Sequence, residues 1–123
     1  MEDLLDLLQR AALSLAQAGS IKERLADAYD RHLMHVDADD LPEPWRDEFL
    51  MLTGALRRET PLRGESPIRA SVRKMSNEEA ERHAAQVVAI FGAVARQSAG
   101  QQPRRLPRSP TMAPIVKLFA ADA

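Results

Sequence analysis

Residues 19–23 read Gly-Ser-Ile-Lys-Glu, and they mark the clearest structural boundary in this chain of 123 residues. Gly19 suits the left-handed backbone position at which many helices end. Ser20 and Glu23 form a capping box, in which the serine oxygen accepts a hydrogen bond from the Glu23 amide and the glutamate side chain reaches back. The stretch therefore predicts that one helix ends and the next begins with only a short turn between them.

Apolar residues on both sides of this boundary recur at spacings of three and four, which is the period of an amphipathic helix. The pattern predicts helices over residues 3–18 and 20–36. Asp37-Ala38-Asp39-Asp40 should end the second helix, because aspartate side chains readily bond to their own backbone in turns.

A third helix is predicted over residues 43–58 by the same periodicity. Its expected buried side comprises Trp45, Phe49, Leu52 and Leu56, widened by Leu50, Met51 and Ala55. Trp45 is the only tryptophan in the chain, and we expect its large ring to anchor the core.

A short fourth helix is predicted over residues 67–74, with Ser66 as its N-cap and a proline at its first position. Ser76-Asn77-Glu78-Glu79 is a second capping box and predicts a fifth helix that runs to about residue 97. Gly92 inside this helix costs about 1 kcal/mol relative to alanine, so a close helix crossing is expected there. No segment alternates with the period of a strand. The predicted fold class is all-α, a small bundle of about five helices, one of them short.

The composition changes at residue 98. Glycine and four prolines stand among Gln, Ser and Arg up to residue 114, a mixture with little apolar surface to bury. We therefore predict a helical bundle domain over 1–97 and a disordered Pro/Arg-rich tail over 98–123. The tail ends in an apolar motif, Ile115-Val116-Lys117-Leu118-Phe119. Its Leu118-Phe119 resembles the Leu-Phe end of peptides that bind bacterial sliding clamps, although Ile115 replaces the leading Gln of that pattern.

Charge is divided unequally along the chain. Residues 1–48 hold twelve acidic and five basic side chains, whereas residues 49–123 hold twelve basic and six acidic ones. The net charge of −1 gives no long-range attraction to nucleic acids or acidic membranes. We expect the two halves to neutralise each other within the bundle, with Arg69, Arg73 and Lys74 facing acidic residues such as Glu23 and Asp27.

The basic stretch from Arg57 to Lys74 supports an alternative function, association with nucleic acid, because its local charge suits contact with phosphates. The fourth and fifth predicted helices also have the outline of a helix-turn-helix. However, Glu78 and Glu79 open the helix that would read the bases, which disfavours this alternative.

No catalytic constellation stands out. The prominent serines, Ser20, Ser66 and Ser76, are explained as N-caps, and the chain has no phosphate-binding loop. His32 and His35 lie three residues apart, so both imidazoles could meet one metal ion. They are better explained as solvated residues at a helix end, and a small metal-dependent helical enzyme is the weakest alternative. No cofactor is predicted.

The leading hypothesis is a non-enzymatic protein-interaction or regulatory module whose partner is another protein or a second copy of the chain. The absence of cysteine and the acidic first residues favour a cytoplasmic location. No apolar run is long enough to span a bilayer, so no membrane partner is expected. The candidate interaction residues are Arg69, Arg73, Lys74, Ile115, Val116, Leu118 and Phe119.

Overall fold

The computed structural model describes residues 3–101, and within them the predicted all-α fold is confirmed. The helices are α1 (Leu4–Leu15), α2 (Ile21–Arg31), α3 (Glu43–Leu56), α4 (Pro67–Lys74) and α5 (Asn77–Gln101), with short 3₁₀ turns η1 (Leu33–His35) and η2 (Ala38–Asp40). No helix in this part of the chain is both long and apolar enough to cross a membrane. The predicted apolar motif, residues 115–119, lies outside the described residues.

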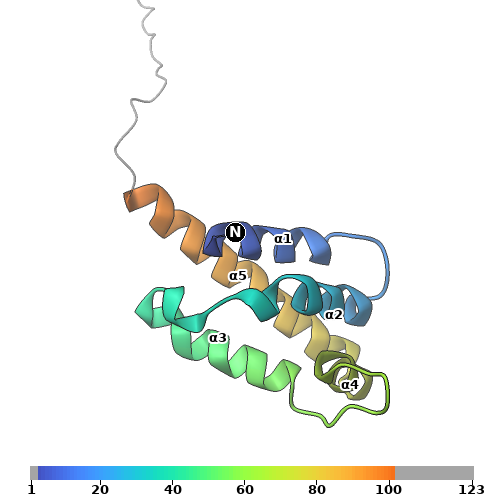
Figure 1. The fold of residues 1–123 in the computed structure, drawn as a ribbon. Helices are drawn as coiled ribbons and strands as arrows, with labels where there is room; N and C mark the ends of the chain where they lie inside the picture. Colours follow the sequence, from blue (N-terminus) through green and yellow to red (C-terminus); the bar gives the residue numbers. More distant parts are fainter. Residues whose placement is uncertain (1–2, 102–123) are drawn as a thin grey trace, which may run out of the picture.

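The helices surround a single core (Figure 1). α1 and α2 form an antiparallel pair, and α5 runs behind both of them. α3 lies on the other side of α2 from α1, and α4 packs against α2 and α3 near the start of α5. The beginning of α1 lies beside the last turns of α5, so both ends of the described chain meet at one end of the bundle.

Side-chain caps define where the helices begin. The hydroxyl of Ser20 accepts from the Glu23 amide at 3.1 Å, which is the serine half of the predicted capping box, and Gly19 has the expected positive φ of 116°. Arg24 fixes the same turn, because its guanidinium donates to the carbonyl oxygens of Leu15 at 2.7 Å and Gly19 at 3.1 Å. Three unsatisfied groups at adjoining helix ends are thereby bonded within one tight turn.

The core is built almost wholly from aliphatic side chains. Its largest fully buried members are Leu8, Leu25, Leu33, Leu41, Leu52, Leu56, Ile68, Val87 and Ile90. The expectation that Trp45 anchors this core is wrong, because its side chain is only partly buried at the core edge. Trp45 lies in the first turn of α3, at one end of the bundle. Phe49, one turn further on, is 3% exposed and takes the central place.

Three helices end earlier than predicted. α1 ends at Leu15 rather than residue 18, and α3 ends at Leu56 rather than 58. α2 ends at Arg31 rather than 36, because His32 leaves the helical region with φ of −132°. The η1 turn that follows places Leu33 in the core. Leu33 would lie on the buried side of a continuous helix too, one turn after Tyr29, so its burial alone does not set where α2 ends.

α5 is longer than predicted, and within residues 3–101 it packs without the close crossing that was expected at Gly92. It continues to Gln101, four residues past the predicted helix end at 97, although Gly100 is a poor helix former. Among the described residues, no close helix crossing is found at Gly92: a Cβ added there would meet only the guanidinium of Arg96, on the same helix, at 3.4 Å.

Candidate interaction surfaces

Arg69 faces the acidic first half of the chain, as expected. Its guanidinium contacts the carboxylates of Asp27 at 2.8 Å and Asp30 at 3.5 Å, which joins α4 to α2. Ser66 strengthens this junction: its hydroxyl accepts from the Arg69 amide at 3.3 Å and donates to Asp30 Oδ2 at 3.2 Å. The predicted N-cap of α4 therefore also holds two helices together.

Arg73 and Lys74 do not face the first half, which corrects that part of the prediction. Arg73 donates two hydrogen bonds to Glu65, at 2.9 and 3.1 Å, and Lys74 lies 3.5 Å from a carboxylate oxygen of Glu59. The Arg73 hydrogen bond, followed by one from the Leu62 amide, lowers the pKa of the Glu65 carboxyl below its ordinary 4.5. The same bond raises the pKa of Arg73. Both cations thus fasten the loop between α3 and α4.

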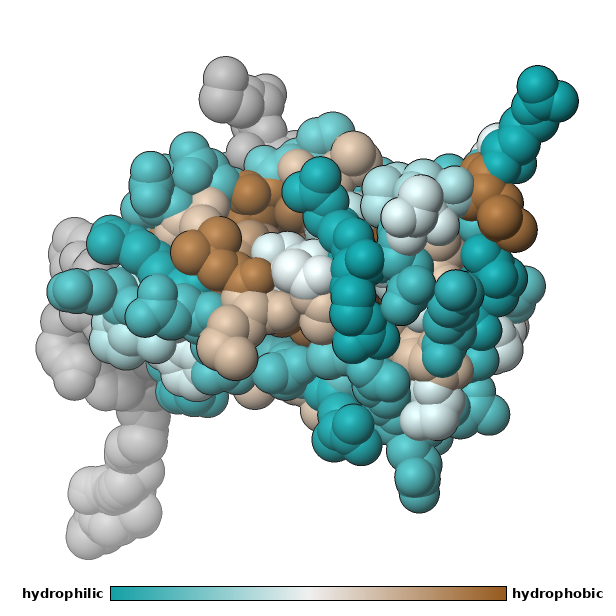
Figure 2. Space-filling model, turned by 90° about the horizontal axis from the view of Figure 1, so that it is seen from below, coloured by the Kyte–Doolittle hydropathy of each residue, from teal (hydrophilic) through white to brown (hydrophobic). Residues whose placement is uncertain are grey.

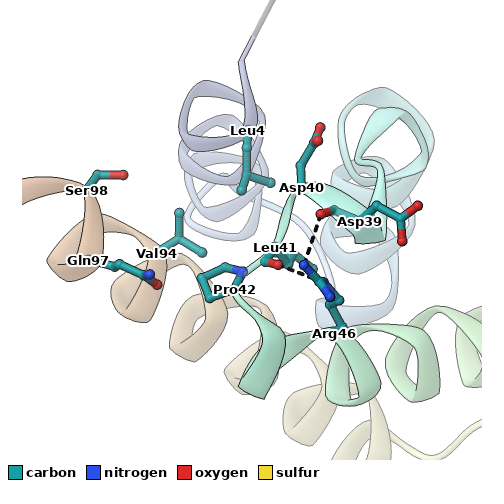
Figure 3. Close-up of a pocket in the computed structure, with 9 residues that line it drawn as sticks. All are labelled: Leu4, Asp39, Asp40, Leu41, Pro42, Arg46, Val94, Gln97 and Ser98. Carbon is teal, nitrogen blue, oxygen red and sulfur yellow. Dashed lines mark hydrogen bonds between the residues drawn. The ribbon is translucent and has the colours of Figure 1, made fainter. Parts of the chain in front are cut away.

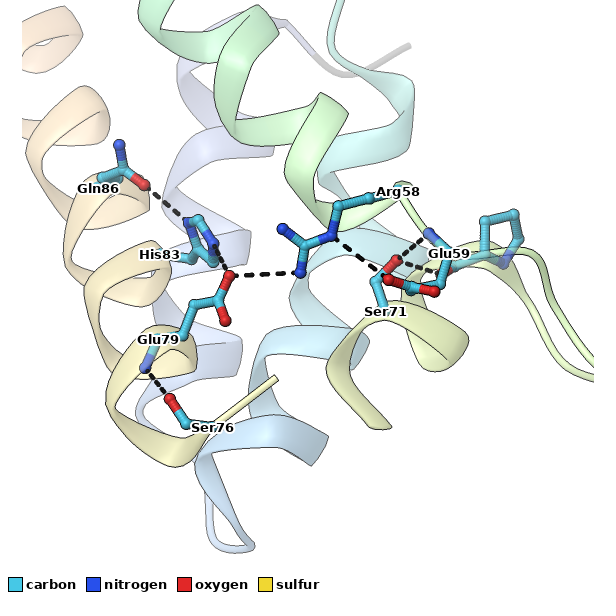
Figure 4. A network of polar contacts seen from close by, with 8 residues as sticks. Arg58, Glu59, Ser71, Ser76, Glu79, His83 and Gln86 are labelled. Atoms are coloured by element: carbon cyan, nitrogen blue, oxygen red, sulfur yellow. Dashed lines mark hydrogen bonds and ion pairs between the residues drawn. The ribbon is translucent and has the colours of Figure 1, made fainter. Parts of the chain in front are cut away.

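Arg58 belongs to a polar network that joins the end of α3 to the start of α5 (Figure 4). Its guanidinium lies 3.4 Å from Glu79 and 3.6 Å from Glu59. Glu79 also lies 3.7 Å from Nε2 of His83, an ion pair only when the imidazole is protonated. The other ring nitrogen of His83 hydrogen bonds to Gln86 at 2.9 Å. Glu79 is therefore held by tertiary contacts, while its amide is capped by the neighbouring serine hydroxyl.

A buried serine completes the attachment of the loop between α3 and α4. The hydroxyl of Ser71 donates to the Pro67 carbonyl at 2.9 Å and accepts from the Glu59 amide at 3.1 Å. Because both bonds lie in the interior, replacing Ser71 would leave the Glu59 amide without its partner. The loop between α3 and α4 is thus bonded to α4 through Ser71 and the Glu59 amide.

These contacts disfavour the nucleic-acid alternative. The cations that a phosphate would need, Arg58, Arg69, Arg73 and Lys74, each already lie against a carboxylate. Arg57 and Arg63 are exposed and make no ion pair within residues 3–101, but two separated cations are a small phosphate footprint. Acidic side chains also occupy the first turn of α5, as the sequence indicates.

The two candidate metal ligands are separated by the end of α2. His32 is the C-terminal cap of that helix, and His35 is an exposed residue of η1. Within the part of the chain that the structure describes, no group of three or more His, Cys, Asp or Glu residues could hold a metal ion.

The outer side of α3 carries an apolar patch that the sequence analysis assigned to the core. Leu50 is 54% exposed and Met51 is 75% exposed, so the prediction that they widen the buried stripe is wrong. Figure 2 views the molecule from the side of α3 and shows apolar surface gathered there, bordered by hydrophilic side chains. We call Leu50, Met51 and Gly54 the α3 patch.

Gly54 makes the α3 patch uneven. It is one turn from both other members of the patch, and a Cβ added to it would meet no atom of residues 3–101 within 4 Å. A hollow of about 300 Å³ opens here, lined by Leu50, Thr53, Gly54 and Arg57. The patch thus combines protruding apolar side chains with a notch that reaches the helix backbone.

A simple signal in the sequence could have identified this patch. Residues 49–52 read Phe-Leu-Met-Leu, and four successive residues of an α-helix sweep about 300° around its axis. Such a run cannot lie wholly on one buried side. The residues that do face inward, Phe49 and Leu52, leave the two between them exposed.

Neither a family model, nor a curated protein, nor a solved structure matches this chain.

Proposed function

We propose that this chain is a cytoplasmic, non-enzymatic protein-interaction module that docks its partner on the α3 patch. The observation that carries the proposal is the exposure of Leu50 and Met51 on adjoining positions of one helix. Burying apolar surface is favourable by roughly 25 cal/mol per Å². Contiguous apolar patches with a polar border are typical of protein contact sites.

The shape of the α3 patch suits an apolar side chain or helix of the partner. The notch at Gly54 lets another backbone or side chain approach closely, while Leu50 and Met51 provide apolar contacts on either side of it. Asp47 and Arg57 are exposed at the edge of the same face and can form the polar rim that interfaces of this kind possess.

The bundle presents this surface rigidly. On the inner side of α3, Phe49, Leu52 and Leu56 are buried in the core, which fixes the orientation of the helix. A surface that is ordered before binding loses little conformational entropy when the partner arrives. The patch can therefore contribute affinity although it contains few residues.

The test begins with a photo-crosslinking residue in place of Thr53, introduced into the full chain in its native cell. The crosslinked protein is identified, purified and titrated against the chain. Leu50→Glu/Met51→Glu should weaken its binding by at least about tenfold, as expected for residues at the centre of an interface. The matched control is Leu13→Glu, which changes a leucine of α1 that is 56% exposed and should leave affinity unchanged.

Sedimentation of the purified chain distinguishes two kinds of partner. A dimer that Leu50→Glu/Met51→Glu converts to a monomer would identify the partner as a second copy. A partner whose affinity is the same for both variants and for the natural chain would refute the α3 patch as the docking surface. Circular dichroism should show equal helix content in all chains, because all three altered side chains already face solvent.

A further inference from the structure

A second hollow, of about 210 Å³, lies at the end of the bundle where α1 begins and α5 nears its last turns (Figure 3). Its apolar walls are Leu4 of α1, Val94 of α5, and Leu41 and Pro42 from the segment that precedes α3. The side chains of Asp39 and Asp40, from η2, stand at its edge. We call it the end hollow.

The charge at this edge is uncompensated. Asp39 and Asp40 are exposed, and neither makes an ion pair within residues 3–101. The cation that lines the hollow, Arg46, points to the backbone instead: it donates to the carbonyl oxygens of Leu41 at 3.0 Å and Asp39 at 3.5 Å. A fitting occupant is therefore an apolar side chain flanked by cations.

The chain itself carries such a segment shortly after α5. Residues 104–108 read Arg-Arg-Leu-Pro-Arg, and Leu106 is the one large apolar residue between positions 100 and 111. The other apolar stretch of the C-terminal region, residues 115–119, contains a single lysine and lies further away. Both charge and position thus favour residues 104–108.

The covalent connection is long enough for this contact. Leu106 lies five positions after Gln101, the last residue of α5, and five extended positions span up to about 17 Å. Val94, on the wall of the end hollow, lies seven residues before Gln101, which corresponds to about 10 Å along the helix. The segment can therefore turn back and reach the hollow.

We propose that residues 104–108 dock in the end hollow of the same molecule, with Leu106 between the apolar walls and the arginines against Asp39 and Asp40. A short tether raises the effective concentration to the order of millimolar, so a contact that would be weak between molecules suffices within one. This site is separate from the α3 patch and does not depend on its function.

The first experiment compares amide chemical shifts of the full chain labelled with ¹⁵N. Leu106→Asp should shift the amides of Asp40, Leu41 and Val94, because their occupant is lost. The matched control, Ile115→Asp, introduces the same charge in the distal motif and should leave these amides unchanged. In the natural chain, about 1 M NaCl should move the same amides toward their positions in Leu106→Asp, because salt screens the ion pairs. Amides that are identical in all chains would overturn the proposal.

The second experiment measures proximity. The sequence has no cysteine, so Ser109→Cys places one spin label just beyond the proposed segment. Its relaxation effect on residues 39–42 should fall when Arg105 and Arg108 are changed to glutamate, whereas residues near the end of α5 stay affected through the tether. An effect that survives the charge reversal would refute docking. So would an effect seen only when a labelled chain is mixed with a ¹⁵N chain, since contact would then be between molecules.

Discussion

At the scale of single residues, several side chains have two partners and so connect elements far apart in sequence. Ser66 caps α4 and also bonds to Asp30 of α2, and Ser71 bonds both within α4 and to the loop before it. Each such hydrogen bond contributes about 0.5–1.5 kcal/mol net, but an orphaned buried partner costs more. These two serines thus stabilise the bundle mainly by giving hydrogen-bond partners to other polar groups.

The two aromatic residues of α3 provide a first prediction. Phe49→Ala should lower the free energy of unfolding by about 3–5 kcal/mol, because the ring is buried and its loss leaves a cavity. Trp45→Ala should cost clearly less, since solvent already reaches that side chain and the surroundings can relax. Urea unfolding of both variants checks the order. A larger loss of unfolding free energy for Trp45→Ala than for Phe49→Ala would mean that Trp45, and not Phe49, is the more important core residue.

Glu65 provides a prediction about pH. Its folded-state pKa is lowered, first by Arg73 and then by the Leu62 amide, so its carboxylate stabilises the fold above the unfolded value near 4.5. This contribution should disappear as the pH falls through the lowered pKa. Glu65→Gln should therefore unfold more easily than the natural chain at pH 7 and equally easily at about pH 2–3. A difference that persists at the lower pH would show that the Glu65 effect is not electrostatic.

At the scale of elements, the helices differ in how completely their surfaces are used. α2 is packed against α1, α4 and α5, whereas α3 has one buried side and leaves its apolar outer side in solvent. Its N-terminus has no side-chain cap and relies on a proline in the first turn. α3 is therefore the element whose sequence is least explained by the stability of the bundle alone, which supports its proposed role in docking.

Two glycines provide a prediction at this scale. Gly54→Ala should stabilise the protein by about 0.5–1 kcal/mol, because the position is helical and an added methyl group has free space. Gly19→Ala should destabilise it, since φ there is +116° and the new Cβ would lie 3.2 Å from Glu23 Oε1. Thermal unfolding of the two variants should move the melting temperature in opposite directions. Gly54→Ala also narrows the notch, so weaker partner binding despite higher stability would support the α3 patch.

At the scale of the whole molecule, the opposed charges of the two halves are only partly neutralised by direct contact. Arg69 connects the basic second half to Asp27 and Asp30 of the first. Arg73 and Lys74 are instead paired with Glu65 and Glu59, which belong to the second half itself. Asp39 and Asp40, at the other end of the bundle, are exposed and make no ion pair with any residue of the described range 3–101. Within residues 3–101, one end of the bundle is therefore acidic, whereas Arg73 and Lys74 are paired with carboxylates of their own half.

This distribution leads to a prediction about Arg69 and Arg57. Arg69→Glu should lower the free energy of unfolding by about 1 kcal/mol or somewhat more, because exposed pairs are worth about 0–1 kcal/mol and the reversal adds repulsion. Arg57→Glu, which breaks no ion pair within residues 3–101, should change stability by at most about 0.5 kcal/mol.

The natural chain should bind duplex DNA no more tightly than about 100 μM near physiological salt. Micromolar binding that Arg69→Glu abolishes would favour the nucleic-acid alternative.

The sequence by itself determined the helices and their starting points. Ser20, Ser66 and Ser76 cap the helices that were predicted from them, because a cap bonds to an amide only three residues away. Such contacts are local, and the spacing of residues along the chain is enough to predict them. The all-α class followed for the same reason, since a helical period is visible within one segment.

Only the tertiary structure decided which apolar residues of α3 remain exposed, where α2 ends, and which carboxylates hold Arg73 and Lys74. A run such as Phe49-Leu50-Met51-Leu52 covers most of the helix circumference, and the position of the neighbouring helices selects the buried side. α2 ends at Arg31 and is followed by η1, although the helical period of the sequence continues to Val36. The end hollow likewise brings together Leu4, Leu41 and Val94, whose proximity depends on the packing of the whole chain.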